Sequence, residues 1–282
     1  MSSPSRTRLA ALVREGKTII APGASDALSA RLIEQAGFPV VYIGSYATAA
    51  SRFGLADVGL IAAPEMVEQA RTIAEAVQIP VIADAENGFQ HAASIWRTVR
   101  AFENAGVAAI HIEDHAFGKH ADVPQRILTL EESVGRIKAA LDARSDPNFL
   151  IIARTDAAWA LGDHDEALRR MQAFAAAGAD MVFPTGLTPL QVGAIRAQVG
   201  KPIVTVDTPG FSIADEERAG IAIVLYYGLS LTVQYSAVKQ ALATLRAEAS
   251  GDHIAGWRER VAELEDFLGY RQFAERARKY DR

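Results

Sequence analysis

The chain has 282 residues, 50% of them hydrophobic and 22% charged, and its 29 basic and 34 acidic side chains give a net charge of −5. This composition is typical of a globular protein with a large core, and the lack of a basic block argues against nucleic-acid binding. The absence of cysteine excludes disulfides, thiolate nucleophiles and cysteine-bound zinc. No apolar run is long enough to cross a membrane and the first residues lack a signal-like apolar segment, so we expect a cytoplasmic protein with no membrane partner.

Eight short, β-branched apolar runs alternate with amphipathic segments along the chain. The predicted strands cover residues 18–24, 40–45, 81–86, 109–114, 150–156, 180–185, 202–207 and 221–226. The predicted helices cover residues 25–36, 64–78, 91–105, 130–144, 163–177, 188–199, 212–219 and 230–248. Because an open doubly wound sheet usually has fewer strands, eight such units predict an α/β fold of the closed (β/α)8 TIM barrel type.

A further charged helical segment, residues 253–280, has no position in an eight-unit barrel. Its apolar residues recur at helical spacing and would be exposed on an isolated barrel. We therefore interpret residues 1–282 as a single barrel domain, in which 250–282 form a C-terminal helical extension that packs on another subunit.

Polar residues cluster where the predicted strands end, which is the edge that carries the active site in this fold. The residues at these ends are Gly44, Ser45, Asp84, Glu86, Glu113, Arg154 and Asp156. Carboxylates a few ångströms apart would repel one another by several kcal/mol, and a divalent cation would remove that repulsion. Since oxygen ligands without cysteine suit hard cations, the pattern favours Mg²⁺ or Mn²⁺.

Each of these residues also has a structural explanation. A carboxylate just after a strand can cap the following helix, and an arginine beside carboxylates is often part of a structural ion pair. Arg154 could therefore be an ion-pair partner or, as we favour, a bidentate ligand of a substrate carboxylate. Four carboxylates together favour an active site over separate helix caps.

Two other sets of residues allow more than one interpretation. A zinc site is conceivable from three residues that alternate along the fourth strand, namely His111, Glu113 and His115. We favour it less, because a histidine inside a strand is more often part of the core. Lys119 and His120 lie in the loop 115–129, which is long for a βα connection and is interpreted as a lid rather than as a solvated loop.

Five longer segments are typical of one enzyme family. They read YIGSYATAASRFGLADVG, IADAENGF, HIEDHAFGK, DPNFLIIARTDA and GADMVFPTG. Through them the chain resembles the isocitrate lyase/phosphoenolpyruvate mutase superfamily over residues 8 to 280. The resemblance implies a small 2-oxo or 2-hydroxy acid as substrate, and a homotetramer whose C-terminal helices are swapped between subunits.

The resemblance also implies roles for individual residues. Mg²⁺ would be held mainly through Asp84, with Glu86, Glu113 and Asp57 contributing through ordered waters. The substrate carboxylate would be bound by a second set, which consists of Gly44, Ser45, Tyr46 and Arg154. The metal would then stabilise a pyruvate enolate, the intermediate when a C–C or P–C bond at C3 breaks.

Departures from the family patterns narrow the activity. Isocitrate and methylisocitrate lyases carry Lys-x-Cys-Gly-His on the lid, whereas this lid reads GKHAD, so we do not expect those two reactions. Lys119 is then the candidate cation for the enolate, and His120 a weaker candidate for the proton donor that replaces the missing cysteine. Members that act on P–C bonds have lysine and proline where this chain has His115 and Gly118, and a histidine where it has Pro184.

We therefore predict a Mg²⁺-dependent C–C bond lyase or decarboxylase acting on an oxaloacetate-like or substituted malate acid through a pyruvate enolate. The alternative enzyme is a phosphonopyruvate hydrolase or phosphoenolpyruvate mutase that acts on a P–C bond. A barrel that binds metal without catalysis is a third reading, against which the joint presence of Asp84, Glu113, Arg154 and Lys119 argues.

Overall fold

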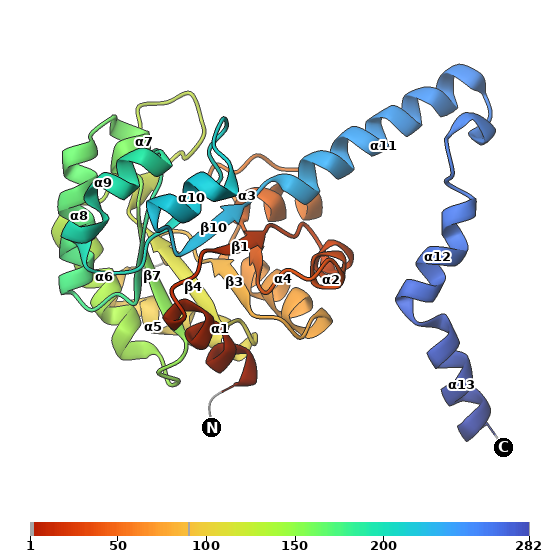
Figure 1. Ribbon diagram of the computed structural model, residues 1–282, viewed down its shortest axis with the longest axis horizontal. Helices are drawn as coiled ribbons and strands as arrows, with labels where there is room; N and C mark the ends of the chain where they lie inside the picture. The colour runs from red at the N-terminus through yellow and green to blue at the C-terminus, as the bar shows by residue number, and fades with distance from the viewer. Residues whose placement is uncertain (1–2, 90, 282) are drawn as a thin grey trace. The chain divides into compact units, whose positions relative to one another are not determined.

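A computed structural model describes residues 3–89 and 91–281 of the chain, and in it eight parallel strands are surrounded by helices (Figure 1). The strands are β1 (Ile19–Pro22), β2 (Val41–Ile43), β3 (Val81–Asp84), β4 (Ala109–Glu113), β7 (Leu150–Thr155), β8 (Met181–Pro184), β9 (Val204–Val206) and β10 (Ile223–Tyr226). The helices that follow them are α2 (Ala27–Gln35), α4 (Ala63–Ala76), α5 (Ile95–Asn104), α6 (Leu130–Ala143), α8 (His164–Ala176), α9 (Pro189–Val199), α10 (Ile213–Ala219) and α11 (Leu229–Glu248). Every predicted strand and helix of the repeat is present.

The strands close into a ring. Hydrogen bonds order one group as β2-β3-β4-β7-β8 and the other as β1-β10-β9. Single parallel bridges, Gly23 with Tyr42 and Val182 with Ile203, join the two groups at both edges. These pairings confirm the predicted TIM barrel, in which each strand lies between two parallel neighbours.

Several short elements were not predicted. They are α1 (Pro4–Arg14), α3 (Ser45–Thr48), η1 (Ala49–Phe53), η2 (Ala92–Ser94), β5 (His115–Phe117), β6 (Arg126–Ile127), α7 (Ala157–Leu161) and η3 (Gly251–His253). β5 and β6 form an antiparallel hairpin inside the segment that the sequence suggested as a lid. The extra segment near the C-terminus divides into α12 (Glu259–Leu268) and α13 (Tyr270–Tyr280).

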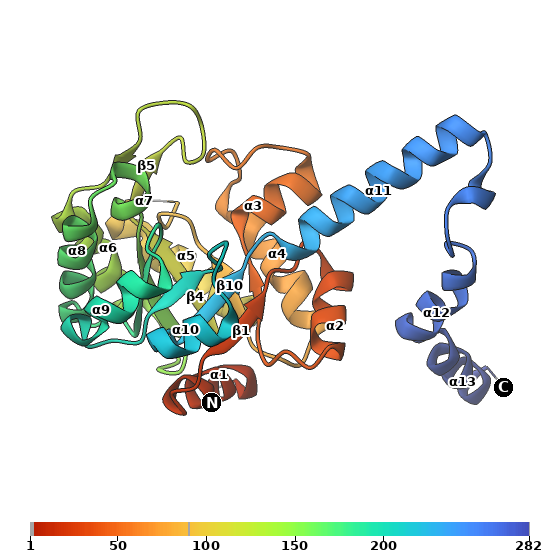
Figure 2. The same ribbon diagram turned by 45° about the horizontal axis from the view of Figure 1, so that its top comes forward.

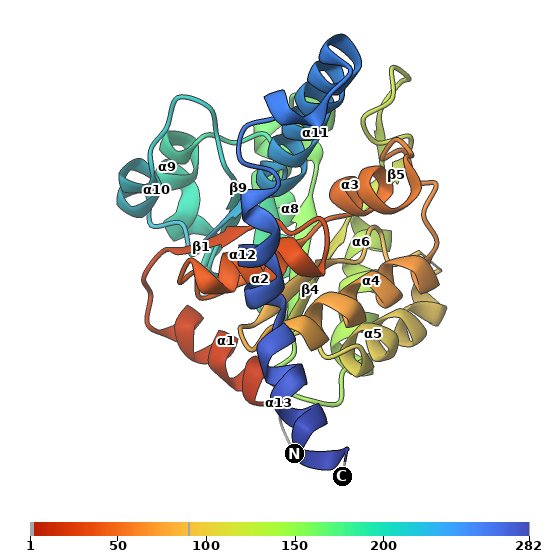
Figure 3. The same ribbon diagram turned by 90° about the vertical axis from the view of Figure 1, so that its right-hand side faces the viewer.

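Helix α1 lies at the end of the barrel opposite the β5–β6 hairpin (Figures 2 and 3). Leu9 belongs to the apolar cluster inside the barrel, so this helix closes its lower end. The Arg6 side chain donates to the carbonyl of Val107 and forms an ion pair with Asp146 at 3.3 Å, both at the starts of strands. The Ser3-Pro4 pair is the signal that could have predicted this helix, since proline favours its first turn.

Contacts divide the chain into two compact units, residues 1–231 and 232–282. The first contains the whole barrel. In the second, none of the residues of α12 and α13 is buried, and α11, expected as the eighth barrel helix, has no buried residue either. That residues 1–282 form one domain with 250–282 as its extension stays a prediction. No helix among the described residues is long and apolar enough to span a membrane.

Glu216 in α10 is a buried carboxyl group whose Oε2 atom has no hydrogen-bond partner among the described residues. Burial, followed by the charges of Asp207 and Asp215, raises its pKa to about 7. Between pH 4.5 and about 7, the Glu216 carboxyl group of the folded protein therefore keeps a proton that the unfolded chain has released. The contribution of this proton to the free energy of unfolding is complete below pH 4.5 and is lost as the pH rises through 7.

We expect the wild-type free energy of unfolding to fall by roughly 1–3 kcal/mol between pH 5 and 8 from this group. Glu216→Gln, which stays neutral, should remove that part of the pH dependence when urea unfolding is measured at both pH values. Glu217→Gln changes an exposed neighbour and is the matched control. Equal pH dependence in Glu216→Gln and wild type would contradict the interpretation.

Candidate active site

Alternation along the strands decides which polar side chains point into the barrel. Asp84 lies two residues after Ile82, and Arg154 lies two residues after Ile152; both apolar residues belong to the cluster inside the barrel. Since side chains on a strand alternate between faces, the polar side chains share the inner face at the point where the strands end. Glu113 lies four residues after Ala109 of β4, which belongs to the same cluster, so it shares that face as well.

Three carboxylates contact the ammonium group of one lysine, and a fourth is linked to it through a serine hydroxyl. We call Asp57, Asp84, Glu86 and Glu113 the acidic cluster. Lys119 Nζ lies 3.1 Å from Glu86 Oε2, 3.2 Å from Glu113 Oε1 and 3.7 Å from Asp57 Oδ2. It also donates to Ser45 Oγ at 3.3 Å, and that hydroxyl donates to Asp84 Oδ2 at 2.9 Å. The sequence-predicted metal ligands therefore converge.

Lys119 is only 3% exposed, so the loop that carries it is not simply solvated. Burial by itself would lower the pKa of this amine, but the carboxylates of Glu113, Asp84 and Glu86 raise it well above the usual value. The side chain is an ammonium ion at neutral pH. It supplies one positive charge at a place where four carboxylates converge.

Asp84 accepts three hydrogen bonds at the end of β3. Ser45 donates to its Oδ2 from the backbone and the hydroxyl, and the Glu86 amide donates to its Oδ1 at 2.8 Å. Burial opposes its ionisation, yet His111, Lys119 and Arg154 hold the pKa of Asp84 below its usual range. The carboxylate is thus ionised and fixed in orientation, as a metal ligand needs to be.

Asp84, His111 and Glu113 form a group whose possible ligand atoms lie within 4.8 Å of one another, the one such group found among the described residues. His111 Nε2 lies 2.9 Å from the Tyr42 hydroxyl. Its Nδ1 is buried and has no hydrogen-bond partner within residues 3–89 and 91–281. Burial lowers the pKa of His111 to about 4, so the ring is neutral at pH 7. The oxygen-rich surroundings fit a hard divalent cation.

The three residues of the zinc alternative, His111, Glu113 and His115, do not converge. His115 faces away from this group, because its Nδ1 lies 3.1 Å from Asp156 and its ring contacts Trp159. It begins the β5 strand of the lid hairpin instead of continuing β4. The zinc alternative, which the sequence favoured less, therefore lacks its third ligand, and His115 lies beyond the end of the predicted strand 109–114.

Arg154 has carboxylate partners on two sides. Its Nε and Nη2 donate to Asp156 at 2.8 and 3.1 Å, which occupies the side-on fork of the guanidinium. Its Nη1 lies 3.2 Å from Glu113 Oε2. Arg154 is therefore a buried ion-pair partner that also lines the cavity described below. Its role as a ligand of a substrate carboxylate stays a prediction.

Gly44, Ser45 and Tyr46 form the turn from β2 into α3 and also line the cavity. A Cβ atom at Gly44 would lie 3.1 Å from the Tyr42 ring, so a larger residue would displace that ring. The Ser45 hydroxyl is occupied by Asp84, and Tyr46 is 40% exposed at the mouth of the cavity. All three residues lie where the sequence predicted them.

His120 stands at the tip of the hairpin with its Nε2 3.4 Å from Asp57 Oδ2. Its backbone has a positive φ of 65°, which costs a non-glycine residue energy and is typical of functional loops. The ring contacts Tyr46 and Trp159 at centroid distances of 6.0 and 5.1 Å. The lid residue is therefore held beside the acidic cluster by aromatic neighbours.

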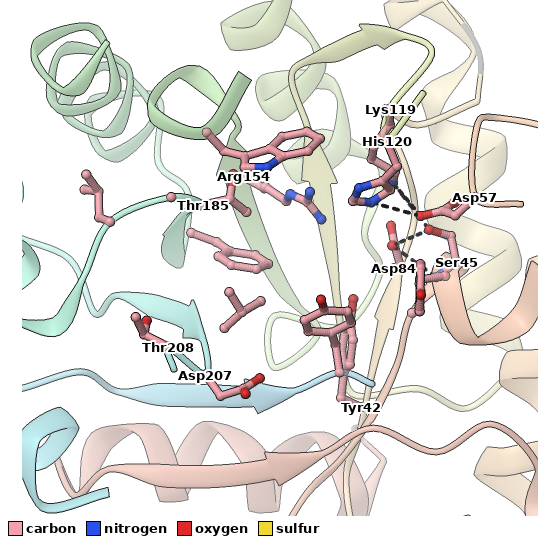
Figure 4. Close-up of a pocket in the computed structure, with 18 of the residues that line it drawn as sticks. Tyr42, Ser45, Asp57, Asp84, Lys119, His120, Arg154, Thr185, Asp207 and Thr208 are labelled. Atoms are coloured by element: carbon pink, nitrogen blue, oxygen red, sulfur yellow. Dashed lines mark hydrogen bonds and ion pairs between the residues drawn. The ribbon is translucent and has the colours of Figure 1, made fainter. Parts of the chain in front are cut away.

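A cavity of about 340 Å³ opens at the carboxyl ends of the strands (Figure 4). Asp57, Asp84, Lys119 and Ser45 gather on one side of it, while Asp207 lies on the opposite side. Its volume is within the range of small-molecule sites. A second cavity of about 340 Å³ is lined by Lys119, Glu86, Glu113, Gly59 and residues 61–64 among others.

Several lining residues were missed by the sequence interpretation, among them Tyr42, Trp159, Thr185 and Asp207. Asp207 ends the seventh predicted strand, so the same rule that found Asp84 could have found it. Tyr42 shares the inner face of β2, and alternation could have shown this. Trp159 lies in the unpredicted helix α7. Thr185, which donates to Asp156 at 2.7 Å, ends the sixth predicted strand, so the same rule could have found it.

Comparison with known proteins places this site in a family. The phosphoenolpyruvate phosphomutase profile matches residues 9–246. The chain belongs to this family. It is 37% identical over 281 residues to 2,3-dimethylmalate lyase of Eubacterium barkeri, covering 95% of this chain and 96% of that protein. It is 35% identical to oxaloacetate decarboxylase of Bradyrhizobium diazoefficiens, covering 91% and 90%.

Solved structures agree with this membership. Phosphoenolpyruvate phosphomutase from Streptomyces platensis subsp. rosaceus superposes with a TM-score of 0.91 at 35% identity, covering 99% of this chain and 100% of that one. A phosphonopyruvate hydrolase complex with oxalate and Mg²⁺ gives 0.90 at 29% identity, covering 99% and 100%. The resemblance to the isocitrate lyase/phosphoenolpyruvate mutase superfamily is thus confirmed, and the chain is an enzyme of that superfamily.

Proposed function

We propose that the protein is a Mg²⁺-dependent carbon–carbon lyase or decarboxylase acting on oxaloacetate or a substituted malate. The observation that carries the proposal is that one cavity at the carboxyl ends of the strands is lined by Asp57, Asp84, Lys119 and Arg154. The other two members of the acidic cluster, Glu86 and Glu113, contact Lys119, and Glu113 also contacts Arg154. Asp84 would be the principal ligand of the cation, with Glu86, Glu113 and Asp57 around it; Mn²⁺ is a possible substitute. When bound, such an ion draws electron density from a carbonyl or hydroxyl oxygen and a neighbouring carboxylate.

The chain's own residues would bind the acid and stabilise charge. Asp156 takes the side-on fork of Arg154 and Glu113 Oε2 lies 3.2 Å from its Nη1, so a substrate carboxylate would bind at the N–H groups that these two partners leave. Ser45 and the amides around residues 44–46 would border the same carboxylate. Lys119, which is 3% exposed, would lie beside the oxygen on which negative charge develops.

The two candidate substrates break different bonds. In oxaloacetate the C3–C4 bond breaks, carbon dioxide leaves, and the resulting pyruvate enolate takes a proton at C3. In a 2-methylmalate derivative the hydroxyl loses its proton, the C2–C3 bond breaks and C3 takes a proton, which gives pyruvate and a shorter carboxylic acid. His120 at the cavity mouth is our candidate for the proton donor.

Pyruvate release in the presence of Mg²⁺ tests this proposal. We expect pyruvate from oxaloacetate or from 2-methylmalate derivatives, and we expect loss of activity after exhaustive EDTA treatment with recovery on adding Mg²⁺ or Mn²⁺. Full activity in the chelated protein would overturn the metal requirement. If zinc restored the activity and magnesium did not, the interpretation of the site as an oxygen-ligand site for a hard cation would be wrong.

A second candidate function is P–C bond chemistry, which the similarity to phosphoenolpyruvate phosphomutase and phosphonopyruvate hydrolase structures favours. Incubation with phosphonopyruvate distinguishes it. Release of inorganic phosphate, or formation of phosphoenolpyruvate, faster than pyruvate release from any carboxylic acid would replace the first proposal with this one.

We also propose that the protein is a homotetramer whose C-terminal helices pack on another subunit, and that it acts in the cytoplasm. The support is a set of large apolar side chains that are at least 43% exposed: Val233, Val238, Leu242, Leu245, Trp257, Val261, Leu264 and Phe273. Sedimentation at micromolar concentration should give a tetramer, and a chain ending at residue 249 should associate less and lose solubility. A stable full-length monomer would contradict this expectation.

A further inference from the structure

The cavity has two chemically different sides, and the barrel topology explains the division. Its charged residues follow neighbouring strands β2, β3, β4 and β7, which form one hydrogen-bonded group. The opposite side follows β8, β9 and β10. Apart from threonines, glycine and Asp207, the lining residues there have apolar or aromatic side chains: Phe183, Leu187, Val206, Pro209 and Tyr227.

The basic side chains that line the cavity all lie toward the acidic cluster and contact carboxylates. Lys119 contacts Glu86 and Glu113, and His120 Nε2 lies 3.4 Å from Asp57. Arg154 lies against Asp156 and Glu113, with its guanidinium carbon 5.2 Å from the centroid of the Phe183 ring. The boundary between the charged and the apolar side therefore runs between Arg154 and Phe183.

On the apolar side the one ionisable lining group with a carboxylate is Asp207, across the cavity from Asp84 (Figure 4). An anionic substituent placed beside the Asp207 carboxylate would meet a like charge, and none of the described residues that line this side of the cavity is a lysine or arginine. A buried anion without a partner is strongly disfavoured, whereas an apolar group gains free energy with each methylene removed from water.

Aromatic rings form an arc along the mouth. Tyr227 contacts Tyr46, Tyr46 contacts His120, and His120 contacts Trp159, with centroid distances of 5.8, 6.0 and 5.1 Å. These four residues all line the cavity. Rings at the mouth and aliphatic side chains below them make a surface suited to a hydrocarbon group.

We infer that the β8–β9–β10 side of the cavity is a subsite for an uncharged hydrocarbon substituent on the substrate, and that Phe183, Leu187 and Val206 determine this specificity. The preferred substrate is an acid with an alkyl chain on the carbon that leaves pyruvate, rather than one with a further carboxylate or a phosphonate there. This inference rests on the proposed function, because it concerns the substituent of the same acid.

A matched series of substrates tests the inference with the unmodified enzyme. The compounds are 2-methylmalates that carry hydrogen, methyl, ethyl, propyl or carboxymethyl at C3, and all of them yield pyruvate on cleavage. We expect kcat/KM to rise about fourfold for each methylene up to propyl. The carboxymethyl compound, similar in size to the propyl compound, should react at least about 100-fold more slowly.

Charge substitution locates the subsite. Leu187→Arg places a cation on the apolar side and should lower kcat/KM for the propyl compound while raising it for the carboxymethyl compound. Leu190→Arg is the control, because Leu190 is 75% exposed at the start of α9 and does not line the cavity. Since Leu187 is buried and its replacement could disturb folding, Trp159→Arg at the half-exposed mouth provides a second test of the same reversal.

The outcomes separate the inference from the proposed function. Pyruvate from the carboxymethyl compound at a rate equal to or above that of the propyl compound overturns the subsite but leaves the lyase activity standing. Pyruvate from none of the malates or from oxaloacetate overturns both. An unchanged propyl-to-carboxymethyl ratio in both Leu187→Arg and Trp159→Arg also overturns the placement of the subsite.

Discussion

Replacing Asp84 with alanine is expected to abolish pyruvate formation, with kcat lowered by more than about 10³-fold, because the principal ligand of a cation worth several kcal/mol in the transition state is lost. The carboxylate is 2% exposed and accepts hydrogen bonds from Ser45 and Glu86, so its orientation is determined before a cation binds. Turnover with excess Mg²⁺ and titration of Mn²⁺ binding are the two measurements.

The matched variants separate charge from shape. Asp84→Asn keeps an oxygen that can accept from Ser45 but removes the charge, and we expect it to lose activity nearly as completely as alanine. Asp142→Ala removes an exposed aspartate from α6 and should leave turnover and Mn²⁺ affinity unchanged. Wild-type turnover in the Asp84→Ala enzyme would remove this residue from the metal site.

Lys119→Ala is expected to lower kcat by about 10²-fold while changing KM little, in line with the loss of one preorganised electrostatic partner of the transition state. Its ammonium group lies 3.1–3.7 Å from carboxylates of the acidic cluster, in a position that is closed to solvent. Steady-state kinetics measure this effect. Lys138→Ala, which alters an exposed lysine of α6, is the control.

The same variant has a second consequence that does not depend on turnover. Without Lys119 the acidic cluster loses its nearest cation, so the carboxylates repel one another until a divalent ion binds. We expect the melting temperature of Lys119→Ala to rise more on adding Mg²⁺ than that of the wild type. A kcat within about twofold of wild type, together with unchanged protease sensitivity of residues 115–129 on adding Mg²⁺ and substrate, would exclude the lid and Lys119 from the mechanism.

The barrel and most of the polar site could be predicted from sequence, because both depend on local patterns. Eight β-branched runs with intervening amphipathic segments are a strong periodic signal, and the ends of parallel strands must meet at one edge. The strand ends in the sequence therefore predicted that one mouth of the barrel holds Asp84, Glu86, Glu113 and Arg154. The extra helix near the C-terminus was found by counting units.

The short elements between the strands could not be predicted in the same way. The lid forms a β hairpin of only three and two residues, too short for a periodic signal, and this hairpin turns His115 toward Asp156 and away from His111. Helix α7 has five residues, and its Trp159 reaches the cavity only through tertiary packing.

What the sequence by itself determined is the set of chemical groups at the barrel mouth, since strand alternation and strand ends are properties of the chain. Only the tertiary structure decided their partners. Asp156 takes the side-on fork of Arg154, and Lys119 enters the acidic cluster from a loop that follows a different strand from Asp57 and Asp84. Such contacts depend on how separate segments fold against each other across the barrel, and no spacing along the chain encodes that distance.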